Sequence, residues 1–178
     1  MVSVNKNWPL SIIILFALII SGCASAFNSR GLNLTGEANF TQVVKEFEPP
    51  NENYAEMPFS ELIYLCTSYA ELKNYNKLFP CLETAQTKVN KGDYIADTWN
   101  HSATPSRLKA TALIELGQYE EAVKAAEHSY KVVMDNNLTT FEVVKVLDVL
   151  GLAYALAGKV VEAEKIAEKL KGLYLGYP

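Results

Sequence analysis

The feature that most constrains the fold is a pattern of helical hairpins that occurs three times after residue 58. Each copy has an apolar stretch with a spacing of three and four residues, a short turn, and a second stretch of the same kind. The turns contain Lys73-Asn74, Gly117-Gln118 and Gly158-Lys159. Such self-similarity predicts stacked helix pairs, because one pair alone cannot bury its apolar side. We therefore expect an all-α fold.

Small and aromatic residues recur at matching places in the copies. The first copy contains Leu62, Leu65, Tyr69, Tyr75, Leu78, Leu82 and Ala85; the second contains Ala110, Leu113, Leu116, Gly117, Tyr119, Ala122 and Ala126; the third contains Leu147, Leu150, Gly151, Tyr154, Gly158, Ala163 and Ala167. These copies resemble the tetratricopeptide repeat, in which a Leu-Gly-x₂-Tyr pattern is followed by a Gly turn and a small Ala in the second helix. The resemblance implies a right-handed superhelical array of about three hairpins.

The copies are longer than the standard repeat. The turn positions Lys73 and Gly117 are 44 residues apart, and Gly117 and Gly158 are 41 apart, compared with about 34 in the tetratricopeptide family. The chain therefore resembles the extended repeats of kinesin light chains and of bacterial signalling proteins. We expect part of the surplus to form a loop between residues 90 and 105. The first copy departs from the pattern at Lys73 and Leu78, and we expect Pro80 in the first turn of its second helix.

The first 23 residues have the layout of a secretory signal. A polar start with one cation, Lys6, precedes an apolar run over residues 10–20 that is interrupted only by Ser11. Small residues then lead to Cys23, as at a cleavage site. The run is too short to cross a membrane comfortably, since a spanning helix needs about 20 apolar residues.

The tetrad from Ile20 to Cys23 resembles the bacterial lipobox. The resemblance implies cleavage before Cys23, a diacylglycerol on its thiol, acylation of the new amine and attachment to the lipid bilayer. Ala24 follows the cysteine, where Asp retains enterobacterial lipoproteins in the inner membrane, so the outer membrane facing the periplasm is expected. The alternative is an ordinary signal peptide that is cut near Ala24 or Ala26.

These features divide the chain into four parts. We expect a signal peptide over 1–22, a flexible lipidated tether over 23–36, a short leading helix and linker over 37–57, and the repeat domain over 58–178. The apolar residues Phe40, Val43, Val44 and Phe47 have helical spacing, and Pro49 must end that helix because Pro50 follows.

Cys66 and Cys81 have two interpretations. In an oxidising compartment they could form a disulfide between the two helices of the first hairpin, closing a loop of about 15 residues. They could equally be two buried free thiols that act as small hydrophobic residues.

No motif points to catalysis. The only histidines, His101 and His128, have no ligand-type residue at metal-binding spacing, and phosphate loops and hydrolase motifs are absent. We expect no enzyme, no cofactor and no metal. Nucleic acid is an unlikely partner, because the formal net charge is −4 and the cations are not clustered.

The resemblance implies a concave groove formed by the first helices, which binds a peptide or a partner domain. Its expected residues are Ile63, Thr67, Arg107, Thr111, Ile114, Glu115, Lys145, Asp148 and Leu152. We expect a membrane-anchored scaffold or assembly factor of the bacterial cell envelope. The alternatives are an accessory subunit of an exported enzyme and a sensor of a small ligand or peptidoglycan fragment. Because no capping helix fits after Lys171, either the tail folds over the last helix or an apolar edge remains there for another protein or for oligomerisation.

Overall fold

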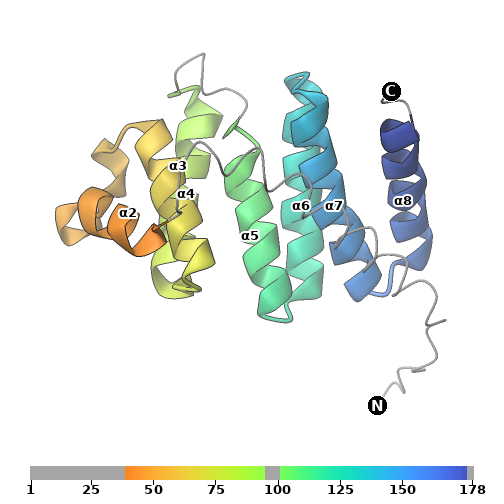
Figure 1. The fold of residues 1–178 in the computed structure, drawn as a ribbon, viewed down its shortest axis with the longest axis horizontal. Helices are drawn as coiled ribbons and strands as arrows, with labels where there is room; N and C mark the ends of the chain where they lie inside the picture. The colour runs from red at the N-terminus through yellow and green to blue at the C-terminus, as the bar shows by residue number, and fades with distance from the viewer. Residues whose placement is uncertain (1–38, 95–100, 176–178) are drawn as a thin grey trace. The chain divides into compact units, whose positions relative to one another are not determined.

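The computed structural model describes residues 39–94 and 101–175, and helices account for nearly all of this part (Figure 1). The α-helices are α2 (Phe40–Phe47), α3 (Phe59–Glu71), α4 (Tyr75–Lys91), α5 (Thr104–Glu115), α6 (Tyr119–Asp135), α7 (Thr140–Leu156) and α8 (Val160–Leu175), and two 3-10 turns, η2 (Pro50–Glu52) and η3 (Tyr54–Glu56), lie between α2 and α3. The prediction of an all-α fold is confirmed. Cys23, the predicted signal peptide and the predicted tether lie outside the described residues.

Each helix packs against the next one along the chain, as expected of a helical repeat array. The hairpins are α3–α4, α5–α6 and α7–α8. In addition, α3 contacts α5 and α5 contacts α7, so the first helices of the hairpins are neighbours. The surplus between the first two copies lies between Lys91, where α4 ends, and Thr104, where α5 begins.

The turns inside the three hairpins have the same backbone geometry. Lys73, Gly117 and Gly158 all take positive φ values, of 55°, 75° and 76°. In each turn the following N–H bonds a carbonyl five residues back: Asn74 to Tyr69, Gln118 to Leu113 and Lys159 to Tyr154, all at 2.9 Å. This is the helix-ending turn that favours glycine. The first copy is therefore equivalent to the others, although a lysine occupies its turn.

We expect Lys73→Gly to raise the free energy of unfolding by about 0.5–1 kcal/mol, because glycine adopts positive φ without steric strain. The ion pair that is lost, from Lys73 Nζ to Glu115 at 3.4 Å, lies on exposed side chains and contributes little. Urea unfolding of both proteins measures the difference.

The reciprocal variant Gly117→Lys is the matched control. A Cβ at Gly117 would meet no atom within 4 Å, so only the backbone conformation opposes the change. It should lower the free energy of unfolding by about 1 kcal/mol. Equal stability of all three proteins would contradict the backbone explanation.

The buried side chains form two main clusters. The first lies between α3 and α4 and includes Leu62, Leu65, Tyr69, Leu78 and Leu82. The second joins α5 to α8 and includes the following small and branched residues: Ala110, Ala122, Ala126, Leu147, Leu150 and Ile166. Phe79 packs against both clusters. The small residues permit close helix approach, and the array consequently has two cores that share few side chains.

A disulfide joins α3 to α4 inside the first core. Cys66 and Cys81 are bonded, their Cα atoms are 5.7 Å apart, and neither side chain is exposed to solvent. The bond therefore cross-links the two helices of the first hairpin.

Pro80 lies further along its helix than the sequence indicates. Because the preceding turn is short, α4 begins at Tyr75, so Pro80 is the sixth helical residue and lies beyond the first turn. It cannot donate a hydrogen bond to Asn76, the residue four before it. Both residues are exposed, so water can bond the carbonyl of Asn76.

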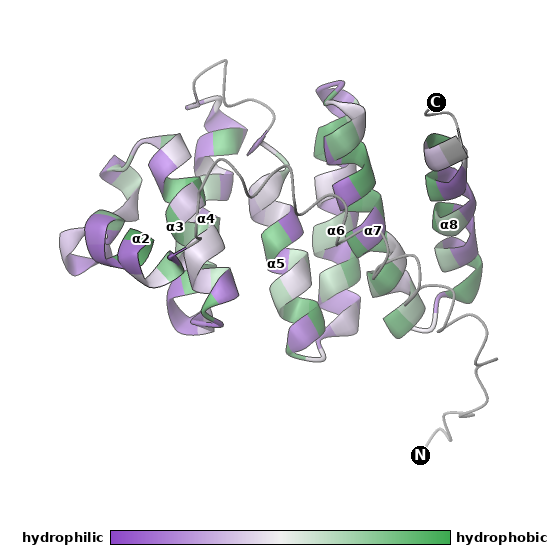
Figure 2. Cartoon of the chain, in the orientation of Figure 1, coloured by the Kyte–Doolittle hydropathy of each residue, from purple (hydrophilic) through white to green (hydrophobic). Residues whose placement is uncertain are grey.

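The last helix continues past the residue where the sequence pattern ends. It runs through 172–175, and Leu173 and Tyr174 pack against the second core. Hydrophobic and hydrophilic residues are interspersed along α8 (Figure 2), and the exposed ones include the charged residues Glu164, Lys165, Glu168, Lys169 and Lys171. Most exposed residues of α8 are therefore charged, and oligomerisation through this end of the array stays a prediction.

Candidate functional site

Six of the nine predicted groove residues lie together on one face of α5 and α7. Arg107, Thr111 and Ile114 follow one another on α5 at a spacing of four and three residues, which places them on one side of the helix. Lys145, Asp148 and Leu152 are placed in the same way on α7. All six are half-buried, and α5 contacts α7. We call these six residues the α5–α7 face.

Charged side chains gather where α5 and α7 begin. Arg107 interacts electrostatically with Glu142 and with Lys145, and His101, three residues before α5, interacts with all three. Glu142 is only 4% exposed, and its Oε1 accepts a hydrogen bond of 2.8 Å from Lys145 Nζ. The same Nζ lies 3.8 Å from the centre of the Phe141 ring. Thus two half-buried cations and one buried carboxylate share a site.

Glu142 was not among the residues predicted from the sequence. It precedes Lys145 by three residues, a spacing at which opposite charges on a helix pair. That spacing is the only signal in the sequence that could have found it. Its burial depends on how α7 packs, which the spacing does not reveal.

Two polar atoms in this cluster have no hydrogen-bond partner: Arg107 Nε and Glu142 Oε2. Burial lowers the pKa of Arg107, and nearby Glu142 opposes that effect. Burial also lowers the pKa of Lys145, and the hydrogen bond that Lys145 donates to Glu142 opposes that effect. A buried polar atom without a partner costs about 1–3 kcal/mol, so a bound group that supplies partners would be favoured here.

The far end of the α5–α7 face is apolar. Ile114 and Leu152 lie there, seven residues after Arg107 and Lys145 respectively. Between the two ends are Thr111, whose hydroxyl donates to the carbonyl of Arg107 at 3.2 Å, and Asp148. Burial raises the pKa of Asp148 to about 6. The face therefore changes from charged to apolar along the helix direction.

The other three predicted residues lie on α3 and at the last position of α5. Ile63 is 5% exposed and belongs to the first core, because α3 is covered by α2 on one side and contacts α5 on another. The Thr67 hydroxyl donates to the Ile63 carbonyl of its own helix at 2.8 Å. Glu115 accepts hydrogen bonds from Tyr75 and pairs with Lys73, so it links α5 to the first hairpin.

Comparisons with protein-family models, with curated proteins and with solved structures find no match to this chain. What the site can do is therefore argued from its own residues. Among residues 39–94 and 101–175, no group of three or more His, Cys, Asp or Glu side chains could hold a metal ion. The helices of the same part include none that is long and apolar enough to span a membrane.

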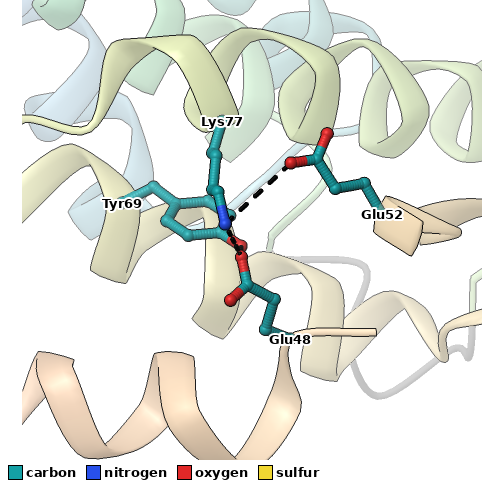
Figure 3. Close-up of polar contacts among 4 residues, drawn as sticks. All are labelled: Glu48, Glu52, Tyr69 and Lys77. Atoms are coloured by element: carbon teal, nitrogen blue, oxygen red, sulfur yellow. Dashed lines mark hydrogen bonds and ion pairs between the residues drawn. The ribbon is translucent and has the colours of Figure 1, made fainter. Parts of the chain in front are cut away.

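A second polar group attaches the leading segment to the first hairpin (Figure 3). Glu48, which follows α2, accepts hydrogen bonds from Tyr69 of α3 at 2.6 Å and from Lys77 of α4. Lys77 Nζ also lies 3.9 Å from Glu52 of η2. We call these four residues the Glu48 clasp. Both hydrogen bonds lower the pKa of Glu48, and the one from Lys77 has the larger effect.

The lowered pKa makes part of the stability depend on pH. A carboxylate with a depressed folded-state pKa stabilises the fold above its usual value of 4.5, and the stabilisation is lost as pH falls through the folded-state pKa. We expect Glu48→Gln to lower the free energy of unfolding by about 1 kcal/mol at neutral pH, since the pair is partly exposed. The difference should shrink as the pH falls from about 5 to about 3.

Denaturant unfolding of both proteins at a series of pH values tests this expectation. Glu71→Gln, which changes an exposed acid at the end of α3, is the matched control and should follow the wild-type curve. A Glu48→Gln deficit that is the same at acidic and neutral pH would show that the charge of Glu48 is not its cause.

A cleft of about 560 Å³ lies between the second helices α4 and α6, and α5 also contributes to its lining. Leu82, Pro105 and Leu113 form its apolar part, and charged side chains including Lys109, Lys124 and His128 surround them. Gln86 Oε1, in the same lining, is buried without a partner. The cleft lies on the side of α5 away from the α5–α7 face, since Lys109 follows Arg107 by two residues.

Proposed function

We propose that this protein is a membrane-anchored lipoprotein of the bacterial cell envelope, built from tetratricopeptide-like repeats, that serves as a scaffold or assembly factor by binding another protein. The observation that carries the proposal is the α5–α7 face. Its six side chains are half-buried, and the buried Arg107 Nε and Glu142 Oε2 beside it lack partners. Helical arrays commonly use such a face of neighbouring helices to bind polypeptides.

The proposed location rests on the sequence and is supported by the disulfide. The lipobox-like tetrad that ends at Cys23 implies acylation, and two or more chains anchor a protein stably. A buried disulfide between α3 and α4 suits an exported protein, because such bonds persist in oxidising compartments.

The anchor is tested by fractionating cells that produce wild-type protein or Cys23→Ser. We expect wild type in the membrane fraction, chiefly the outer membrane, and Cys23→Ser in the soluble envelope fraction at high salt. Membrane association of Cys23→Ser at high salt would refute a lipid anchor. Because Cys23→Ser leaves the bond between Cys66 and Cys81 in place, a change in fractionation cannot be attributed to loss of that disulfide.

The scaffold role is tested with a photo-reactive amino acid at Thr111, at the centre of the face. Irradiation of intact cells should link this position to a discrete second protein. The matched position is Glu168, on the exposed side of α8, which should give no such product. Absence of a product at Thr111, or the same product at Glu168, would count against binding at the α5–α7 face.

A further inference from the structure

The order of residues along the α5–α7 face limits what can bind there. α5 and α7 are parallel, because each begins a hairpin and the charged residues at their starts interact. Both helices pass from a cation to an apolar side chain over seven residues: Arg107 to Ile114, and Lys145 to Leu152. At about 1.5 Å per residue, the two ends are separated by about 10 Å.

The charges at the polar end favour an acidic group. Lys145 is already hydrogen-bonded to Glu142 Oε1, whereas Arg107 Nε has no partner. With two cations and one carboxylate, the cluster has an excess positive charge. A carboxylate beside Arg107 would supply the missing acceptor, and the planar guanidinium can bond it with two N–H groups.

The remaining unpartnered atom favours a polypeptide with an open backbone. Glu142 Oε2 accepts hydrogen bonds only and needs a donor. An extended segment offers both N–H and C=O groups, whereas a helix uses most of its own internally. In a polyproline-II segment the rise is about 3.1 Å and every third side chain lies on the same side. Three residues of such a segment cover the distance between the two ends.

From these contacts we infer that the α5–α7 face binds an extended segment of a partner protein that carries an acidic residue and an apolar residue three positions apart. The acidic side chain lies at Arg107, the apolar one lies at Ile114 and Leu152, and a backbone N–H of the segment donates to Glu142. The inference rests on the proposed scaffold function, because it takes the ligand to be part of another protein.

Selection from a random seven-residue peptide library tests the pattern. The full-length protein in detergent micelles is the bait, alongside Arg107→Met and Lys109→Met. Lys109→Met is the matched control, because it removes one positive charge from α5 on the side of the α4–α6 cleft. We expect peptides with Asp or Glu three positions from an apolar residue to be enriched by wild type and Lys109→Met and not by Arg107→Met.

The most enriched peptide then gives the affinity by fluorescence anisotropy. Arg107→Met, and replacement of the peptide's acid by its amide, should each weaken binding about tenfold or more. Combining the two changes should add little further, as expected when the two groups contact each other. Lys109→Met should remain within about twofold of wild type, and the melting temperature of Arg107→Met should be no lower than that of wild type.

Three results would overturn the inference: no enrichment, enrichment of basic or helix-spaced sequences, or an acidic pattern that survives Arg107→Met. The photo-cross-link at Thr111 separates this failure from failure of the scaffold function. A cross-linked partner without the acidic pattern leaves the scaffold function standing and refutes only the ligand chemistry. If neither a cross-linked partner nor the acidic pattern is found, the scaffold function and the ligand chemistry are both refuted.

Discussion

The double variant Cys66→Ala/Cys81→Ala is expected to have a free energy of unfolding about 3 kcal/mol lower than that of the oxidised wild-type protein. The disulfide closes a loop of 15 residues, and removing it restores chain entropy to the unfolded state. Denaturant unfolding with and without reductant measures the effect. Reductant should destabilise the wild type and leave the double variant unchanged.

The loss should be concentrated in the first hairpin. The disulfide lies in the core between α3 and α4, and that core shares only a few residues, such as Phe79, with the second. In a repeat array, stability is roughly a sum of local contributions. Amide hydrogen exchange should therefore accelerate in α3 and α4 more than in α7 and α8. Uniform acceleration across all helices would contradict the description of two separate cores.

The second large effect is expected from Leu147→Ala, which should lower the free energy of unfolding by about 3 kcal/mol, within the usual range of about 2–5 kcal/mol. Leu147 is 0% exposed and lies in the second core, where α7 meets α6 and α8. The change removes apolar contacts and leaves a cavity in a close-packed region. Urea unfolding measures it, and hydrogen exchange should show the loss mainly in α5 to α8.

Leu156→Ala is the matched control for Leu147→Ala. Leu156 ends the same helix and is 40% exposed, so the same truncation should change the free energy of unfolding by less than about 0.5 kcal/mol. Similar losses in the two variants would show that burial of the side chain does not determine the effect. The comparison matters for the site, because Lys145 and Asp148 flank Leu147 on α7.

Particular residues show how far the sequence could predict the site. Arg107 and Lys145 were expected on a shared face because matching positions of successive repeats lie on the first helices, and the two charges do interact. Ile63 occupies a similar position in the first copy but is buried, since α2 and α5 pack against α3. Glu115, also expected in the groove, accepts a hydrogen bond from Tyr75 and forms an ion pair with Lys73. Neither outcome could be read from spacing within one repeat.

The hairpin pattern in the sequence determined the class of fold. Periodicity and turn residues are local properties, and they specify helix, turn and helix in each copy, even where Lys73 replaces glycine. Only the tertiary structure decided which polar groups lose their solvent, because that depends on contacts between residues distant in the chain. Four features were decided in this way: the burial of Glu142, the unpartnered Nε of Arg107, the Glu48 clasp and the bond between Cys66 and Cys81.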